Sequence, residues 1–408
     1  MLVLENVTLP DLANGNLLPG HHLAVEGDLI VEVSDRPIKS ADAERIDLAG
    51  RCLLPGLIDA HFHATLTEMN PVNSRDLPPT LMTARAGILL RRALMRGYTT
   101  VRDMAGADWG MRAATAEGTI LGPRLYIAGR ALSQTGGHGD LRRRADHEIP
   151  CSCSNALAFM SVVADGTPAV QAAAREQLRQ GVDHLKVFVS GGVVSPSDPL
   201  HSIQYTAEEL SAIVHEATSW GTYVAAHAYT PPSIIRSVTA GIRTIEHGNL
   251  LDAQAAAAMA TNKAFLVPTL ITYDVMHRKG STIGLSAFSL EKLAEVFAAG
   301  LRSIELAIKA GVPVGLGTDL LGDLHEYQSE ELLLRARVQR PHEVLRAATE
   351  INAAILGLSG KLGTIRPGAY ADLIAVEGDP LRDLGLLQDQ GAHPDLIMKA
   401  GAVVKRAL

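Results

Sequence analysis

The chain has 408 residues, of which 47% are hydrophobic and 4% aromatic, and its formal net charge at pH 7 is -7. This length and apolar content suit one large barrel with a smaller second domain. The mild charge and the scattered basic residues exclude a nucleic-acid footprint, and no apolar run reaches membrane-spanning length. We therefore expect neither nucleic acid nor a membrane as a partner.

The cysteines and the first residues bear on the cellular compartment. Cys52, Cys151 and Cys153 are too few and too unevenly placed for a disulfide framework, which fits a reducing compartment. Residues 1–7 already have the pattern of a strand, without the basic leader and apolar core of a signal peptide. We expect a cytoplasmic protein.

Both ends of the chain are rich in short β-like runs separated by turn residues. The clearest runs are Leu2–Leu9, His22–Glu26, Leu29–Val33, Ala371–Val376 and Leu396–Val404. Because neither end has enough strands for a core of its own, the two are expected to pair with each other. We predict a composite β-sandwich domain from residues 1–53 and 358–408.

Residues 54–357 alternate short apolar strands with longer helical stretches, which predicts a parallel sheet with helices outside it. The strand candidates are Leu53–His61, Thr99–Asp103, Leu125–Gly129, His184–Val189, Tyr223–His227, Thr244–His247, Phe265–Thr269 and Val312–Asp319. Helical segments include Thr80–Arg96, Thr167–Gln180, Thr206–Trp220, Pro232–Ala240, Asp252–Thr261 and Leu290–Ala310. Eight such units predict a closed (β/α)8 TIM barrel, whose chemistry lies at the carboxyl ends of the strands.

Local signals mark where several of these helices begin and end. Thr206 and Glu209 have the spacing of a capping box at a helix start. Glycines follow the helical runs where left-handed C-caps are expected. They are Gly97, Gly181, Gly221, Gly241 and Gly311.

The first predicted barrel strand leads into His61-Phe62-His63. Because successive side chains of a strand alternate between its faces, His61 and His63 point the same way and can hold one ion. On its own this pair is weak support for a metal, since surface or core histidines satisfied by hydrogen bonds have the same spacing. The later strands strengthen the metal hypothesis.

Four further polar side chains sit at or near the ends of predicted strands, namely Lys186, His227, His247 and Asp319. Four imidazoles and a carboxylate suit a divalent transition metal, with Zn²⁺ the default and Mn²⁺, Co²⁺ or Fe²⁺ as alternatives. For His227 and His247 the alternative is a core histidine bonded to backbone, an explanation that weakens when all four occur together.

Lys186 places an amine inside the apolar strand His184–Val189. Burial disfavours the charged form and lowers the pKa of a lysine, which leaves a neutral nucleophile. Such an amine can add carbon dioxide to form a carbamate that acts as a carboxylate and bridges two cations. The alternative is a lysine paired with Asp319 or Glu246.

The motifs together resemble the metal-dependent amidohydrolase superfamily, and within it the branch of imidazolonepropionase-like enzymes and Xaa-Pro and Xaa-Arg dipeptidases. The resemblance covers nearly the whole chain, in the order Leu54–His63, Gly315–Asp319 and Arg366–Leu373. It implies that His61 and His63 bind the more buried of two ions and that His227 and His247 bind the more exposed one. It further implies that carboxylated Lys186 bridges the two.

In this resemblance Asp319 is both a ligand and the catalytic base. A water held between two cations loses a proton near neutral pH, and one metal polarises the substrate carbonyl. Asp319 then passes the proton of the hydroxide to the departing amine. Such a site hydrolyses amide, peptide and related carbon–nitrogen bonds.

Loops after the strands bear on specificity. Gln134–Gly139 contains two glycines before His138, which let the backbone approach a ligand, although an ordinary glycine turn has the same composition. In dipeptidase-like relatives a similar loop and the tyrosine after the strand-five histidine, here Tyr229, hold the free α-carboxylate of the substrate. The Gly191–Pro196 loop is either a substrate-lining loop or a structural turn, and Tyr273–Phe288 is expected to form a mobile flap.

The leading hypothesis is a binuclear amidohydrolase that releases the C-terminal amino acid of a dipeptide or N-acyl amino acid. One alternative is an amidase for a xenobiotic aryl amide such as ochratoxin A. Another is a cyclic amidohydrolase or a deaminase, although Lys186 argues against a simple deaminase. The non-enzymatic alternative is a barrel that only binds a ligand. Relatives of this type often form homo-oligomers, so we expect a homo-oligomer here. The role of His325 stays open, because the residues around it depart from the pattern of many relatives.

Overall fold

The computed structural model describes residues 1–142, 145, 160–195, 198–280 and 282–408. Cys151, Cys153 and Pro196, which the sequence analysis named, lie outside these ranges. Within them, no helix is both long enough and apolar enough to cross a membrane. The only cysteine described, Cys52, is buried and free.

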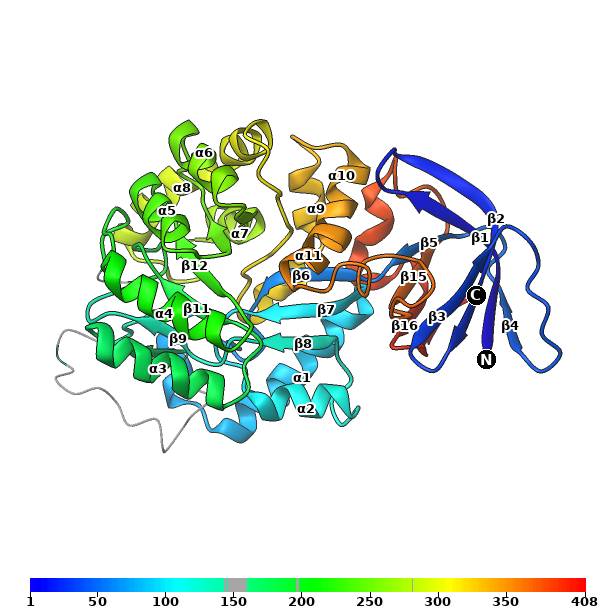
Figure 1. The fold of residues 1–408 in the computed structure, drawn as a ribbon, viewed down its shortest axis with the longest axis horizontal. Coiled ribbons are helices and arrows are strands. Elements are labelled where there is room, and N and C mark those ends of the chain that lie inside the picture. Colours follow the sequence, from blue (N-terminus) through cyan, green and yellow to red (C-terminus); the bar gives the residue numbers. More distant parts are fainter. Residues whose placement is uncertain (143–144, 146–159, 196–197, 281) are drawn as a thin grey trace.

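The two ends of the chain build one mostly antiparallel sheet system that lies beside the barrel and contains both termini (Figure 1). Its strands are β1 (Leu2–Asp11), β2 (Asn16–Glu26), β3 (Leu29–Ser34), β4 (Glu44–Asp47), β5 (Cys52–Pro55), β15 (Leu373–Val376), β16 (Pro394–Lys399) and β17 (Ala402–Arg406). Their order is β17-β16-β15-β5-β1-β2-β3, with β4 paired to β1. This arrangement agrees with the predicted composite domain.

Side chains from both ends meet in one buried cluster of this domain. Leu4, Leu23 and Ile30 come from the N-terminal strands, and Leu373 and Met398 come from the C-terminal ones. Because neither set can bury its apolar face alone, the two halves stabilise each other. The division between residues 53 and 54 stays a prediction, and the pairing of β5 with β15 continues to Pro55.

The barrel strands run in parallel, with helices on the outside (Figure 1). They are β6 (Leu57–Phe62), β7 (Tyr98–Asp103), β8 (Arg124–Ile127), β9 (Ala131–Ser133), β11 (Leu185–Phe188), β12 (Val224–Ala228), β13 (Thr244–His247) and β14 (Phe265–Val267), and β10 (Ser161–Val163) pairs with β9. The helices are α1 (Pro79–Met95), α2 (Trp109–Ala116), α3 (Thr167–Arg179), α4 (Ala207–Ser219), α5 (Pro231–Thr239), α6 (Ala253–Thr261), α7 (Leu270–Lys279), α8 (Ala287–Lys309), α9 (Glu330–Arg335), α10 (Pro341–Arg346) and α11 (Asn352–Ile355).

The predicted first strand is interrupted at Gly56, so the expectation of one strand over Leu53–His61 was wrong. β5 pairs with the sandwich strand β15, whereas β6 pairs with β7 of the barrel. A Cβ at Gly56 would lie 2.1 Å from Thr99 Oγ1, so only glycine lets the two segments pass at this point. The chain crosses from one domain to the other there.

The segment predicted as the eighth strand, Val312–Asp319, is also less regular than expected. Its only β-bridge among the described residues joins Leu266 and Val314. Backbone hydrogen bonds still close the barrel: Ala60 N donates to Leu316 O at 2.9 Å, and Thr318 N donates to His61 O at 3.2 Å. The segment therefore keeps the place of a strand without its regular ladder. Asp319 consequently faces the ends of β6.

The helix signals in the sequence are confirmed. Thr206 and Glu209 form a reciprocal capping box at the start of α4. The five glycines expected at helix ends have φ values between 72° and 97°. These local choices agree with the overall fold.

Candidate metal centre and substrate cavity

Six polar side chains that are far apart in the sequence line one cavity at the carboxyl ends of the barrel strands. His61 lies on β6 and His63 directly follows it, Lys186 lies on β11, His227 on β12, His247 on β13, and Asp319 follows the eighth segment. Because the strands are parallel, their carboxyl ends meet at one mouth. The fold thus brings together every metal-ligand candidate from the sequence.

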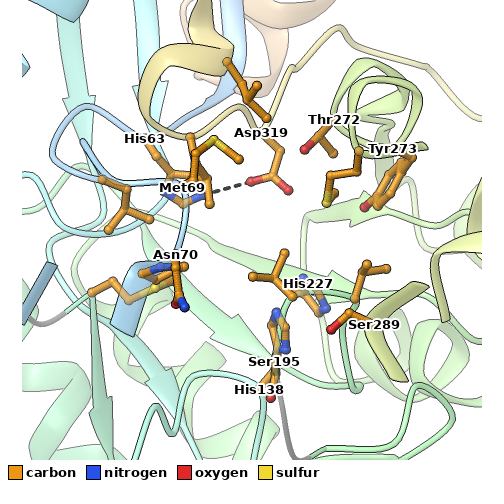
Figure 2. Close-up of a pocket in the computed structure, with 18 of the residues that line it drawn as sticks. His63, Met69, Asn70, His138, Ser195, His227, Thr272, Tyr273, Ser289 and Asp319 are labelled. Carbon is orange, nitrogen blue, oxygen red and sulfur yellow. Dashed lines mark ion pairs between the residues drawn. The ribbon is translucent and has the colours of Figure 1, made fainter. Parts of the chain in front are cut away.

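Asp319 is the point where the histidines converge. Its Oδ1 lies 3.0 Å from His63 Nε2 and 3.3 Å from His61 Nε2. Ligand atoms of His61, His247 and Asp319 all lie within 4.8 Å of one another, which is close enough to share an ion. Figure 2 shows the ion pair between His63 and Asp319 at the centre of the cavity.

Each of the four imidazoles uses one ring nitrogen for a contact outside the cavity. The contacts are His61 Nδ1 to Glu246 Oε2 at 2.9 Å, His63 Nδ1 to Ala105 O at 3.3 Å, His247 Nδ1 to Thr269 Oγ1 at 2.8 Å, and His227 Nε2 to Gly191 O at 3.2 Å. Metal-ligating histidines have this kind of outer partner, which fixes the tautomer. The donor set therefore fits divalent ions, which Nδ1 of His227 and Nε2 of the other three would hold.

Burial and mutual contacts set the charges of the candidate ligands. Burial lowers the pKa of His227 and of His247 well below the usual range, so both imidazoles are neutral and available as ligands. Burial disfavours the Asp319 carboxylate, but the neighbouring His61 and His63 outweigh it and hold its pKa well below the usual range. Neutral imidazoles beside an ionised carboxylate are the donors that Zn²⁺ prefers.

Lys186 is 2% exposed, and burial lowers its pKa to about 8. Within the part of the chain that the structure describes, no ion pair joins it to Asp319 or Glu246, so the paired-lysine alternative is not what the structure shows. Glu246 instead contacts His61 and Arg102. A neutral amine is therefore accessible near neutral pH, as addition of carbon dioxide requires.

His247 and Asp319 both have a left-handed backbone, with φ values of 73° and 53°. Residues other than glycine rarely adopt this conformation, and such strain concentrates at functional sites. The two strained residues are candidate ligands of the same site.

The cavity is lined by both apolar and polar side chains. The apolar lining residues, which we term the apolar wall, are Leu66, Met69, Pro71, Met104, Leu141, Met160, Phe188, Val193, Val194, Met276, Ile283, Leu285, Leu321 and Leu324. The polar ones besides the ligand candidates are Asn70, His138, Ser195, Tyr229, Thr272, Tyr273, Ser286 and Ser289. In Figure 2, Met69 and Asn70 lie on one side, and Tyr273, Ser289 and His138 lie on the others.

His138 lies against a candidate metal ligand, not in an exposed turn. Its ring stacks on His227 at 4.5 Å, its backbone N–H donates to Gln204 Oε1 at 2.9 Å, and its Nδ1 lies 3.3 Å from Asp198 Oδ2. A Cβ at Gly192 would lie 2.2 Å from His138 Cε1, so the close approach of the two loops depends on that glycine. The loop that begins at Gly191 does line the cavity, through Val193, Val194 and Ser195.

Three residues of this site, Arg102, Lys292 and His325, were missed or left open by the sequence. Arg102 donates to Glu246 at 2.8 Å inside the barrel, and a charged residue in the apolar run Thr99–Asp103 was the available signal. Buried Lys292 donates to the carbonyls of Gly192, Ser195 and Asp198. The sequence pattern of α8 does not predict these contacts. His325 is 1% exposed and its Nε2 donates to His63 O at 3.2 Å, so it supports the site from behind.

The prediction of an irregular flap over Tyr273–Phe288 was wrong for its first part, because α7 extends to Lys279. The hydrophobic residues of α7 do not repeat along one face, since the helix is covered on several sides, and its periodicity was therefore hard to recognise. Tyr273, on this helix, has its hydroxyl 2.6 Å from that of Tyr229.

Comparison with known proteins gives these features a family. The profile of the Amidohydrolase family matches residues 52–404. The chain belongs to the amidohydrolase family. A curated relative of this amidohydrolase, an ochratoxinase from Aspergillus niger, is 32% identical over 365 residues, which span 86% of this chain and 75% of the relative.

Solved structures extend the similarity of this amidohydrolase to dipeptidases. A prolidase complexed with N-methylphosphonate-L-proline is 44% identical with a TM-score of 0.97, and 99% of each chain is covered. A Xaa-Pro dipeptidase with bound methionine is 27% identical with a TM-score of 0.88, again with 99% of each chain covered. The predicted branch of the family and the predicted TIM-barrel fold are thus confirmed, with a (β/α)8 barrel beside the composite sheet domain. The protein is a hydrolase that acts on carbon–nitrogen bonds.

Proposed function

We propose that this amidohydrolase hydrolyses the amide bond of a dipeptide or N-acyl amino acid and releases the C-terminal amino acid. The observation that carries the proposal is the convergence of His61, His63, Lys186, His227, His247 and Asp319 on one cavity that also presents His138 and Tyr229. The similarity to a prolidase and a Xaa-Pro dipeptidase supports the same substrate class.

In this proposal His61 and His63 hold one divalent ion, His227 and His247 hold a second, and a carboxylated Lys186 contacts both. Zinc is the ion that this donor set favours first. Ions bound there would lower the pKa of a water and polarise the scissile carbonyl. The outward contacts of the four imidazoles prepare the remaining ring nitrogens for this role.

Asp319 has the position of the proton carrier. It is partly exposed to the cavity and lies within 3.3 Å of both His61 and His63. Its ionised carboxylate accepts the proton of the attacking water as the oxygen bonds to the carbonyl carbon. The proton then goes to the amine nitrogen as the carbon–nitrogen bond breaks, so the products are a carboxylate and a free amine.

The polar and the apolar lining residues would contact different parts of the substrate. His138 and Tyr229 lie against His227 and His247, where they would hold the α-carboxylate of the departing amino acid. The methionines and leucines of the apolar wall would receive an apolar acyl group, because burial of such a group against them is favourable without a charge partner.

A second candidate function follows from the same wall and from the similarity to ochratoxinase. An amidase for a bulky aryl amide such as ochratoxin A would use the apolar wall for the aryl group and the same carboxylate site. Hydrolysis of a cyclic amide is the remaining alternative, and it would release no separate amino acid.

A panel of dipeptides, N-acyl amino acids, one aryl amide and one cyclic amide tests these proposals on zinc-loaded enzyme. We expect release of a free amino acid and no ammonia. Asp319→Asn should lower kcat/KM by about a hundredfold to ten-thousandfold, and Lys186→Ala should lower both the metal content and the rate. The exposed Lys309→Ala serves as the matched control.

If Lys186→Ala and Asp319→Asn kept turnover near that of the unmodified enzyme, the assigned roles would be wrong. Elemental analysis of active protein gives an independent check. Two transition-metal ions per chain are expected, and active protein without any would contradict the proposal.

A further inference from the structure

A line of hydrogen-bonding side chains runs from His247 into the cavity. Thr269 Oγ1 lies 2.8 Å from His247 Nδ1, the Thr269 hydroxyl donates to the Tyr273 hydroxyl at 3.5 Å, and the hydroxyls of Tyr273 and Tyr229 lie 2.6 Å apart. None of these four side chains is more than 2% exposed. Because all four are buried, hydrogen bonds with one another satisfy polar atoms that would otherwise lack a partner.

The number of hydrogens gives the direction of the first part of this line, from His247 to Tyr273. Each hydroxyl has one hydrogen to donate. Thr269 gives its hydrogen to Tyr273, so toward His247 it can only accept, and the imidazole proton then sits on Nδ1. That tautomer leaves Nε2 of His247 without a proton, as a metal ligand needs.

The same count continues at the tyrosines. Tyr273 accepts from Thr269, and either tyrosine can be the donor of the bond between them, because a hydroxyl oxygen can accept two hydrogen bonds. The pair therefore keeps one hydrogen that no acceptor takes among the residues that the structure describes.

We propose that Tyr273 is a positioning residue whose hydroxyl holds the hydroxyl of Tyr229 in place to bind the carboxylate of the substrate. This inference rests on the proposed function, since it takes an anionic oxygen as the partner of Tyr229. Both tyrosines line the cavity, and Figure 2 shows Tyr273 on the wall that faces Asp319. Tyr273 acts through Tyr229, and the pair lies on two different elements, β12 with its following loop and α7.

Removal of the Tyr273 hydroxyl leaves the Tyr229 hydroxyl free to rotate away from the carboxylate of the substrate. A donor lost from an anionic oxygen weakens its binding by about tenfold to a hundredfold. The loss should appear mainly in KM and only with substrates that have a free carboxylate. The C-terminal amide of the same substrate should respond by less than about threefold.

A double-mutant cycle with Tyr273→Phe, Tyr229→Phe and the combined variant tests this dependence. We expect each single variant to raise KM for a carboxylated substrate, and the combined variant to equal Tyr229→Phe alone. Tyr205→Phe is the matched control, because Tyr205 is 2% exposed and its hydroxyl has no hydrogen-bond partner among the described residues. Additive effects of the two substitutions, or an equal loss with the amide substrate, would overturn the inference.

Calorimetry provides a readout that does not depend on turnover. Zinc-loaded enzyme is titrated with L-proline and L-phenylalanine and with their amides. Tyr273→Phe should weaken binding of the amino acid that the enzyme holds most tightly by about tenfold and leave its amide unchanged. If the unmodified enzyme neither cleaved the panel nor bound either amino acid, both the proposed function and this inference would be overturned. If Tyr273→Phe kept normal turnover and binding, this inference alone would be overturned.

Discussion

His61 Nδ1 and Glu246 Oε2 lie 2.9 Å apart in the interior of the barrel, and neither side chain is more than 2% exposed. The other oxygen of Glu246 accepts from Arg102 at 2.8 Å and from the Thr244 hydroxyl at 2.6 Å. Burial disfavours the Glu246 carboxylate, but Arg102, His61 and Lys186 together outweigh it and hold the pKa of Glu246 far below the usual range. The negative charge on Glu246 therefore keeps the His61 proton on Nδ1 and leaves Nε2 for a metal.

Glu246→Gln keeps the shape of this contact but removes the charge. We expect the dissociation constant of the first metal ion to rise about tenfold to a hundredfold, since outer partners of ligating histidines contribute that much. Competition with a chelator, followed by elemental analysis, measures the change. The exposed Glu305→Gln is the control, and equal metal retention in the two variants would contradict the role given to Glu246.

Asp198→Asn tests how His138 is held. Asp198 Oδ2 lies 3.3 Å from His138 Nδ1 and also accepts from Gly192 N at 2.9 Å. Burial disfavours the charged carboxylate, but His138 outweighs it and lowers the pKa of Asp198 to about 2. An asparagine keeps the bond from Gly192 and loses the charge that orients the imidazole. We expect KM for a carboxylated substrate to rise about tenfold with kcat little changed. Steady-state kinetics measures both constants. A loss confined to kcat would place His138 in the chemical step instead.

The barrel and the candidate ligands could be predicted because each has a local signature. Apolar strands that end in His61, His227 or His247 can be recognised without knowing their neighbours, and parallel strands bring their carboxyl ends together in any barrel. The composite sheet followed from two β-rich ends that lack separate cores. These are properties of short stretches of sequence.

The supporting residues could not be predicted, because their roles depend on distant partners. Arg102 and Glu246 are 144 positions apart, and Lys292 and Gly192 are 100 positions apart. Nothing in either local sequence indicates that they meet. Tyr273 was assigned to an irregular stretch for the related reason that α7 is covered on several sides, so its hydrophobic pattern has no single period.

Gly192→Ala tests the close packing of the two cavity loops. The added Cβ would lie 2.2 Å from His138 Cε1 and 2.4 Å from His138 Nε2, so the imidazole has to move. A displacement of about 1 Å at a binding group costs up to about a hundredfold in rate. We expect kcat/KM to fall by about tenfold or more, with thermal stability nearly unchanged because the imidazole is at the cavity surface. The control is Gly87→Ala on α1, where the nearest atom to the new Cβ is 3.6 Å away, and it should leave kcat/KM unchanged. An unchanged kcat/KM in Gly192→Ala would show that the position of His138 is unimportant.

His325 gives the fold a dependence on pH. Burial lowers its pKa from 6.5 to about 3, and its Nε2 donates to the His63 carbonyl. Below pH 6.5 the unfolded chain takes up a proton at this imidazole and the folded chain does not, so the free energy of unfolding falls as the pH falls from 6.5 toward 3. The whole loss is on the order of 5 kcal/mol, and none of it arises above pH 6.5. His325→Gln retains a donor for the His63 carbonyl without a titrating group, so its stability should decline less between pH 6.5 and pH 4.5. Denaturant unfolding of the metal-free protein at several pH values measures this difference, with the exposed His215→Gln as the control. If the stability of His325→Gln and of the unmodified protein changed with pH in the same way, the folded protein would take up the proton at His325 as readily as the unfolded chain. The burial of His325 would then not give the fold its dependence on pH.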